Sequence, residues 1–332
     1  MISAPNISVI IPTYNRGYTI EHSINSVLAQ TYTNYELIIV DDGSTDATAS
    51  LVKTICASGR PGVERISYVR QEQSGKSAAL NRGIAAAKGE WLAFLDSDDV
   101  WLPTKLDMQL KALKEFEPCD ACFTDAQYTN NPKLNVTAFR RAGRRHSGII
   151  GLLPDALSFV IDEPHGIHEQ TLLVRISRFK EMAPFDSNIR VLEDHDFVFR
   201  LALHVKRFCF VNRPLVEIDR TPVRSIGLID LFRREEVRLR DQQYIYEKWL
   251  ALPGLGLPVR RKIHGYLCSV YSGWANVYLE QHQYEKARDA MSIAMRHQLA
   301  PTTALKWAFV KFAPGLMRRR LNSGITQSDA IA

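Results

Sequence analysis

Three aspartates follow directly on an apolar run in the stretch EWLAFLDSDDVWLP, residues 90–103. Residues 91–95 are largely apolar and are typical of a buried strand, and Asp96, Asp98 and Asp99 come at its end. Carboxylates held this close raise one another's energy when all of them are ionised. The sequence therefore predicts that something positive lies among the three acids.

The elements that must position these acids alternate between strand and helix through the first hundred residues. Strands are predicted at 7–14, 35–44, 64–71 and 91–99, and helices at 18–32, 46–58 and 75–89, the last closed by Gly89. Such alternation predicts a parallel, doubly wound sheet, which binds ligands outside the carboxyl ends of its strands. Tyr14, Asp42 and the three aspartates all fall at those ends.

The rest of the chain predicts two regions, a domain over residues 1–223 and a helical part over 224–332. A helix at 105–116 and a strand at 120–128 precede a polar, basic excursion at 129–148. Residues 273–301 resemble one tetratricopeptide hairpin, and since such units need about three copies to stand alone, we expect it to pack as a single hairpin.

The net charge of +6 is uneven, because residues 224–332 hold 17 Lys and Arg against 9 Asp and Glu. A basic tail on a near-neutral body argues against a nucleic-acid binder. It fits either a solvated helix or contact with an anionic membrane through residues 304–321, which combine aromatic side chains with three arginines. No apolar run of about 18 residues and no secretory signal appear, and the five scattered cysteines suit reduced thiols. We therefore expect a cytoplasmic protein. If the tail binds lipid, the protein would lie peripherally at the inner face of the cell membrane.

Four motifs in order resemble the family 2 glycosyltransferases of GT-A fold: ISVIIPTYNR, ELIIVDDGSTD, SGKSAALNRGIAAAKGEWLAFLDSDD and LEDHDFVFRL. The resemblance covers roughly residues 5–220. It implies a Rossmann-like, mostly parallel α/β sheet with flanking helices, followed here by a C-terminal helical extension. It also implies transfer of a sugar, with inversion, from a nucleotide-sugar, UDP being favoured by family habit. The acceptor would be a glycan or a lipid-linked glycan.

The resemblance gives the three aspartates a role with Mg²⁺ or Mn²⁺. A nucleoside diphosphate carries about two negative charges, and carboxylates repel it unless a hard cation intervenes. Asp96 and Asp98 are expected to contact the nucleotide and Asp98 and Asp99 the metal, with the division among the three left open. The alternative is an aspartate-rich turn that caps the next helix.

The ends of the first two strands are expected to hold the nucleoside. Tyr14 can form an apolar wall, Pro12 and Thr13 can supply backbone contacts, and Asp42 can bond the base edge, although DDGS is also ordinary turn chemistry. Lys76 lies in SGKS, which is no Walker A motif because Arg70 stands where that motif needs glycine. At the start of a helix, Lys76 is expected to favour a phosphate or a base edge.

A general base is needed to take the proton from the acceptor hydroxyl. In the predicted helix LEDHDFVFRLAL, the side chains of Glu193, Asp196 and Arg200 share one side and can pair. Asp194 lines up instead with Leu201, on the side expected to face the body of the protein. By resemblance, the base is the aspartate of the Glu-Asp pair, Asp194. The alternative is that Asp194 only caps the helix.

Three other classes of protein were compared with this prediction. A sugar-1-phosphate nucleotidyltransferase would need a glycine-rich phosphate loop after the first strand, and PTYNRG is not one. A receiver-like regulator would place its acidic pair after the first strand, whereas here the pair follows the second. A non-catalytic nucleotide-sugar-binding or scaffold subunit would be expected to lose the acid cluster or the base, and both are present.

Overall fold

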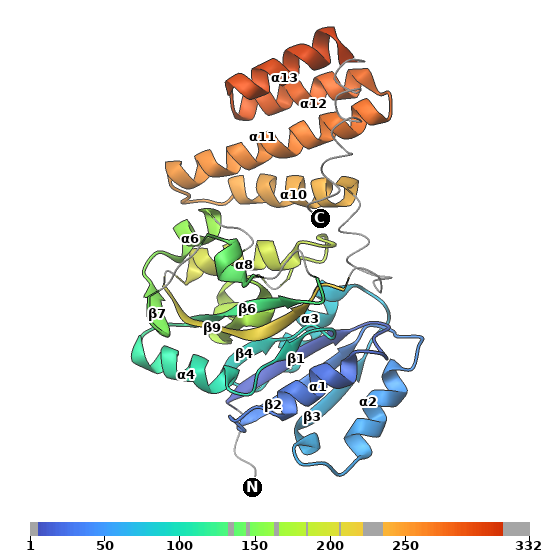
Figure 1. Cartoon of the computed structure of the whole chain (residues 1–332), viewed down its shortest axis with the longest axis vertical. Helices are drawn as coiled ribbons and strands as arrows, with labels where there is room; N and C mark the ends of the chain where they lie inside the picture. The colour runs from blue at the N-terminus through green and yellow to red at the C-terminus, as the bar shows by residue number, and fades with distance from the viewer. Residues whose placement is uncertain are drawn as a thin grey trace. The chain divides into compact units, whose positions relative to one another are not determined.

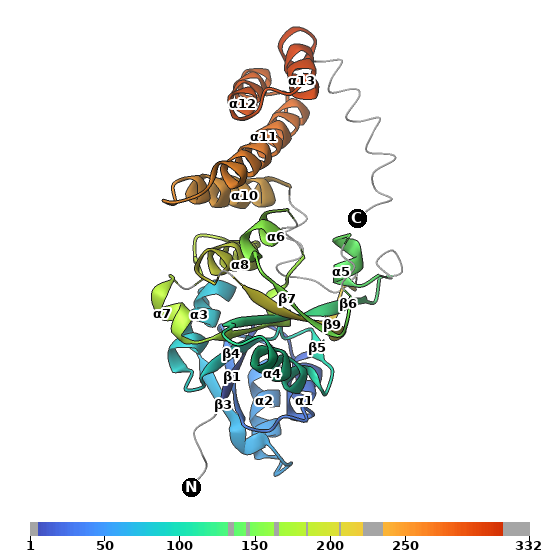
Figure 2. The same cartoon turned by 90° about the vertical axis from the view of Figure 1, so that its left-hand side faces the viewer.

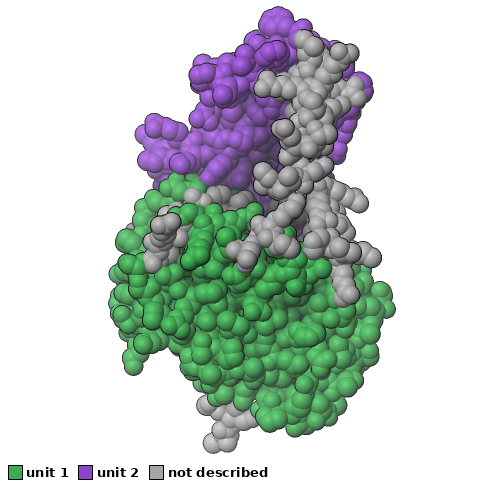
Figure 3. Space-filling model, in the orientation of Figure 1, with its two compact units in different colours: residues 1–188, 193–224 green, residues 189–192, 225–332 purple. Residues whose placement is uncertain are grey.

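The computed structural model describes residues 6–131, 136–143, 147–162, 166–183, 185–205, 207–221 and 235–314. The chain divides into two compact units, coloured in Figure 3. Unit 1 comprises residues 1–188 and 193–224, and unit 2 comprises residues 189–192 and 225–332. Each unit has its own core and is described separately.

The first half of unit 1 is a parallel sheet in the order β3-β2-β1-β4 (Figure 1). Its strands are β1 (Ile7–Thr13), β2 (Tyr35–Asp41), β3 (Ile66–Arg70) and β4 (Trp91–Phe94). The connections contain α1 (Ile20–Leu28), α2 (Thr48–Ala57), η1 (Val63–Arg65) and α3 (Lys76–Ala86). All four predicted strands and three predicted helices are confirmed, with shorter bounds than the sequence indicated.

The second half of unit 1 mixes strand directions within the same nine-stranded sheet. β8 (Leu172–Arg175) runs antiparallel to β4 and to β6 (Ala121–Thr129), which is parallel to β9 (Phe208–Asp219). β5 (Val100–Trp101) and β7 (Ile150–Leu153) both pair antiparallel with β9 (Figure 2). The helical segments here are α4 (Lys105–Glu115), α5 (Ala138–Arg141), α6 (Ala156–Asp162), η3 (Glu169–Thr171), α7 (Ser177–Glu181) and α8 (Glu193–His204).

Burial explains why the parallel half forms. All seven residues of β1 are buried, as expected for a strand covered on both faces. Ile20, Ile24 and Val27 of α1 are also buried, which confirms the predicted helical spacing. Gly89 lies after the end of α3 and not within it: a Cβ there would come 2.6 Å from the backbone nitrogen of Ser8. The turn from α3 into β4 therefore needs glycine in order to pass against β1.

The described helices of unit 2 are α10 (Glu235–Leu250), α11 (Leu257–Glu280), α12 (Tyr284–His297) and α13 (Pro301–Phe312). The hairpin of α11 and α12 buries small and aliphatic side chains, including Ala275, Leu279, Ala287 and Met291. Among the residues described, no helix is long and apolar enough to cross a membrane. The predicted basic triplet Arg318–Arg320 lies outside the described residues.

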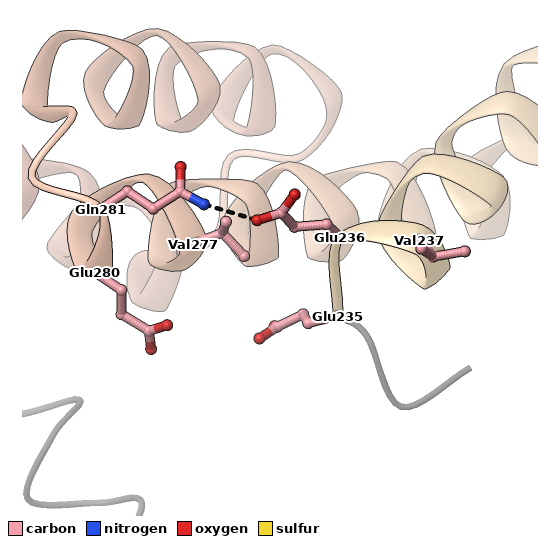
Figure 4. A pocket seen from close by; sticks show the side chains of 6 residues that line it. All are labelled: Glu235, Glu236, Val237, Val277, Glu280 and Gln281. Atoms are coloured by element: carbon pink, nitrogen blue, oxygen red, sulfur yellow. Dashed lines mark hydrogen bonds between the residues drawn. The ribbon is translucent and has the colours of Figure 1, made fainter. Parts of the chain in front are cut away.

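A pocket of about 400 Å³ lies in unit 2, between the start of α10 and the end of α11 (Figure 4). Its lining consists of Glu235, Glu236, Val237, Val277, Glu280 and Gln281. The amide of Gln281 donates a 2.7 Å hydrogen bond to Glu236, so one of the three lining carboxylates is already engaged. The residues predicted to do chemistry all lie in unit 1 instead.

Candidate functional site

The three aspartates of the opening motif form one cluster after β4. One carboxylate oxygen from each of Asp96, Asp98 and Asp99 lies within 4.8 Å of the others. The turn that gathers them is held by its backbone, because the Asp99 N–H donates to the Asp96 carbonyl at 3.1 Å. The N–H of Leu95 also donates to Ile10 of β1 at 3.0 Å, which fixes the start of the turn at the carboxyl end of the sheet.

Asp99 is the innermost acid, with 2% of the residue exposed. One carboxylate oxygen accepts from the backbone N–H of Asp219 at 2.9 Å and the other accepts from the amide of Gln170 at 2.8 Å. Burial, and then the charges of Asp98 and Asp96, raise the pKa of Asp99 well above its usual range. Asp99 therefore anchors the turn to β9, and its role as a metal ligand stays a prediction.

Asp98 is the outermost acid, with a side chain that is 31% exposed. The guanidinium of Arg16 lies 3.5 Å from its carboxylate. Burial and the neighbouring Asp96 raise the pKa of Asp98, while Arg16 and Lys76 oppose the shift. The sequence prediction missed Arg16, although its place in the loop that follows the carboxyl end of β1 was a usable signal.

Lys76, the first residue of α3, connects the acid cluster to two further carboxylates. Its ammonium lies 2.8 Å from Asp96 and 3.0 Å from Glu193, and it also forms an ion pair with Glu169. Burial lowers the pKa of Lys76, but the carboxylates, led by Asp96, outweigh it and raise that pKa well above its ordinary value. The positive charge expected among the acids is thus present as two side chains, Lys76 and Arg16.

Glu169 and Gln170 were not predicted as site residues. Glu169 is 1% exposed, and burial raises its pKa well above the usual range, against the opposing charge of Lys76. The amide of Gln170 donates to Asp96 at 2.7 Å and to Asp99 at 2.8 Å, and so bridges two acids of the cluster. Both residues precede β8, and only the antiparallel pairing of β8 with β4 brings them to the site.

The predicted nucleoside residues gather at the ends of β1 and β2. Pro12 and Thr13 are buried at the end of β1, and Tyr14 after them is 38% exposed. The Thr13 carbonyl accepts from the backbone N–H of Asp42 at 2.9 Å, so the two strand ends are joined. The Thr13 hydroxyl is buried without a hydrogen-bond partner among the described residues.

Asp42 holds the loop between β3 and α3. Its carboxylate accepts from the backbone N–H groups of Ser74 and Gly75 and from the amide of Gln71, each at 2.8 Å. A carboxylate has about four acceptor positions, so these three bonds leave room for one more donor. The predicted contact between Asp42 and a base edge therefore stays a prediction.

The faces of α8 differ from the prediction. Asp196 is fully buried and pairs with Arg200 at 2.8 Å, and Glu193 is buried against Lys76, whereas Asp194 is only half-buried. The side that Asp194 shares with Leu201 does face the body, since Leu201 is fully buried, but the opposite side is buried as well because Lys76 and Arg200 neutralise Glu193 and Asp196. The charge of Asp194 contributes to raising the pKa values of Lys76 and Glu169.

Comparison with known proteins identifies this arrangement. A family model described as Glycosyl transferase family 2 matches residues 8–169. An uncharacterized glycosyltransferase of Rickettsia typhi is 32% identical over 217 residues, which make up 64% of each protein. Residues 8–169, which lie in unit 1, therefore form a domain of the family 2 glycosyltransferase type.

Two further proteins are similar to the chain. The Escherichia coli protein WfgD, named UDP-Glc:alpha-D-GlcNAc-diphosphoundecaprenol beta-1,3-glucosyltransferase, is 42% identical over 108 residues, which are 32% of this chain and 40% of WfgD. The matched part thus spans less than two thirds of the length of both relatives. Residues 1–349 of S. aureus TarS, solved with UDP-GlcNAc, superpose with a TM-score of 0.69 at 17% identity, over 97% of this chain and 92% of that one. This likeness bears out the predicted GT-A fold.

Proposed function

We propose that the protein transfers a sugar from a nucleotide-sugar to an acceptor hydroxyl and inverts the anomeric configuration. The observation that carries this proposal is the placement of a partly exposed carboxylate, Asp98, at the carboxyl ends of the parallel strands, with Asp194 in the first turn of α8 next to Glu193, which pairs with Lys76. A UDP-sugar is the favoured donor. The names of WfgD and of the TarS complex, which refer to UDP-Glc and UDP-GlcNAc, support that preference.

The acid cluster fits a hard divalent cation. Mg²⁺ and Mn²⁺ prefer oxygen ligands, and three carboxylate oxygens within 4.8 Å of one another form such a set. Asp98 is the acid most open to a ligand and would be the principal one, with Asp99 behind it. When bound, the metal would offset the charge that develops on the departing nucleoside diphosphate.

The nucleoside would occupy the ends of β1 and β2. Tyr14 offers a half-exposed ring for one face of the base, and Asp42 has an acceptor position left for a base N–H. Pro12 and Thr13 would contribute their backbone, and Asp96 would accept from a ribose hydroxyl. Arg16, which pairs with Asp98, would face the diphosphate.

Asp194 would act as the general base. It lies in the first turn of α8, where the positive end of the helix dipole stabilises a carboxylate. As the acceptor oxygen forms its bond to the anomeric carbon, Asp194 takes the hydroxyl proton and the bond to the diphosphate breaks. The electron pair leaves with the nucleotide, and attack opposite the leaving group gives inversion.

The acceptor is proposed to be a glycan, with a lipid-linked form favoured. WfgD is named for such an acceptor. Leu305, Phe309 and Phe312 form an exposed apolar stripe on α13, opposite the buried Thr303 and Val310, and the cation Lys311 lies beside it. We place this stripe on an anionic lipid surface, at the cytoplasmic face of the cell membrane.

Thermal unfolding with UDP, GDP, dTDP and CDP, each with and without Mn²⁺, tests the donor site. A ligand that binds only the folded state stabilises it by about 2.7 kcal/mol at a hundredfold excess over Kd. The proposal predicts a Mn²⁺-dependent shift, largest for UDP. No shift with any nucleotide would contradict it and favour a scaffold role.

A further inference from the structure

Lys76 connects three segments that are distant in the sequence. Its ammonium contacts Asp96 in the turn after β4, Glu169 in η3 and Glu193 in the first turn of α8. The proposed nucleotide site and the helix that carries the proposed base therefore meet at one side chain. The side chain of Lys76 is 15% exposed, and Glu169 and Glu193 are more deeply buried.

This environment does not suit a phosphate ligand. Three carboxylates surround one ammonium, and the nearby Asp194 adds to the negative potential that raises the pKa of Lys76. A diphosphate would have to approach against that potential and compete for a cation that is already paired. The outermost acid, Asp98, has Arg16 beside it, so a cation nearer to solvent is available for the diphosphate.

Glu169 adds a third acid beside Lys76 that the pairing of this lysine does not require. A buried carboxylate is costly unless it is paired, and Lys76 already has Asp96 and Glu193. Among the described residues, Lys76 is the only cation that forms an ion pair with Glu169, and the second carboxylate oxygen of Glu169 has no hydrogen-bond partner there. The unfavourable burial of Glu169 points to a positional role. In this role Glu169 fixes the Lys76 ammonium between the turn after β4 and the first turn of α8.

We infer that Lys76 is a positioning residue, held by Glu169, that couples occupancy of the nucleotide site at Asp96 to the placement of α8 and so of Asp194. This inference rests on the proposed function and replaces the predicted phosphate role of Lys76. Lys76 would contribute to catalysis by holding Asp194 in place, because a misplacement of about 1 Å between reacting groups costs about a hundredfold in rate.

Hydrogen exchange of the α8 peptide, residues 193–204, measures this coupling without any acceptor. The probe is UDP with Mn²⁺ at a tenfold excess over its Kd, and that Kd is determined separately by calorimetry. In the wild type, exchange across α8 slows by about tenfold, since opening of α8 must first release the nucleotide. The variants are Glu169→Gln, Lys76→Met and Lys76→Arg, with Glu90→Gln as the control, because Glu90 is an exposed partner of Arg175 away from the site.

The inference expects Lys76→Met to reduce the slowing to less than about twofold while the Kd changes by less than about threefold, because an open α8 is rare in the free protein. Glu169→Gln should show a partial loss, Lys76→Arg a partial rescue and Glu90→Gln no change. If Lys76→Met fails to fold, the double variant Lys76→Met with Glu169→Gln, which removes one charge of each sign, serves in its place.

Two results overturn the inference and leave the proposed function intact. The first is full slowing of α8 exchange in Lys76→Met or in the double variant. The second is a loss of UDP affinity of about tenfold or more in Lys76→Met, which would make Lys76 a direct nucleotide ligand. Absence of UDP binding to the wild type would instead remove the proposed function itself, and the calorimetric Kd identifies that case.

Discussion

The guanidinium of Arg16 lies 3.5 Å from the carboxylate of Asp98, so the loop after β1 provides a protein cation for the outermost acid of the cluster. A divalent cation bound at Asp98 must share that carboxylate with Arg16 or displace the guanidinium toward the diphosphate. The acid cluster is therefore partly neutralised by the protein itself, without a metal. The three acids differ in how deeply they are buried, and we expect their roles to differ accordingly. The depth of each acid leads to different expectations for its substitution.

Asp98→Asn should abolish the Mn²⁺-dependent part of the thermal stabilisation that UDP gives the protein, because it removes the charge of the proposed metal ligand. The melting temperature without ligands should change little, since Asp98 is the most exposed of the three acids. Thermal unfolding with UDP, with and without Mn²⁺, checks both statements, and Asp107→Asn on the exposed side of α4 is the matched control. Retention of the full Mn²⁺ effect in Asp98→Asn would remove Asp98 from the metal site.

Asp99→Ala should instead destabilise the fold by about 1–3 kcal/mol, because the backbone N–H of Asp219 loses its acceptor and the Gln170 amide keeps only its bond to Asp96. Urea unfolding of the ligand-free protein measures this loss. An Asp99→Ala variant as stable as the wild type would show that Asp99 does not anchor the turn.

Asp194→Asn should lower turnover of the donor selected by the nucleotide panel by about a hundredfold or more, since it removes the proposed base. Affinity for UDP with Mn²⁺ should stay within about threefold, because Asp194 lies on α8 and not at the strand ends. Release of UDP from the UDP-sugar and calorimetric titration measure the two quantities. Turnover near the wild-type level would assign the base to another residue.

Lys105 predicts a pH dependence of stability. Its ammonium is fully buried, bonded to Gln109 at 2.8 Å, and burial lowers its pKa from 10.5 to about 7. Between those two values the unfolded chain holds the proton that the folded protein lacks, so the free energy of unfolding rises with pH, by at most about 1.4 kcal/mol per unit. Below about pH 7 this contribution is flat, because both states are protonated.

Lys105→Met is the variant that isolates this effect. Urea unfolding at pH 7 and pH 9 should give a larger increase in the wild type than in Lys105→Met, since the other titrating groups are common to both. Equal increases in the two proteins would contradict a neutral Lys105 in the folded state.

The exposed stripe of α13 predicts lipid binding. Phe309→Asp with Phe312→Asp should reduce sedimentation with vesicles that contain phosphatidylglycerol, because both rings are on the exposed face of α13. Thr302→Asp, at an exposed position of the same helix, controls for added charge. The membrane proposal would be contradicted if the double phenylalanine variant sedimented with the vesicles as much as the wild type does. It would also be contradicted if the wild type did not sediment with them at all.

The strand ends of the site were predictable from the sequence because parallel strands bring their carboxyl ends to one edge. Tyr14, Asp42 and the three aspartates follow apolar runs directly, and their positions needed only the strand–helix alternation. The contacts of Lys76 with Glu169 and Glu193 were not predictable, because they depend on β8 running antiparallel to β4 and on where α8 begins.

The burial of α8 shows a second limit. Periodicity assigned Asp194 to the inward side because its helical neighbours are apolar, but Glu193 and Asp196 are buried more deeply. Polar character predicts exposure only when no opposite charge is within reach. Lys76 lies far away in the sequence, so its pairing with Glu193 could not enter the prediction.

The most direct measurement is a crystal structure of the protein soaked with UDP and Mn²⁺, with anomalous scattering used to locate the manganese. We predict an anomalous peak at the carboxylate of Asp98, at a site shared with the diphosphate, and the uracil beside Tyr14 and Asp42. A manganese peak away from Asp98, or UDP bound elsewhere than at the ends of β1 and β2, would contradict it.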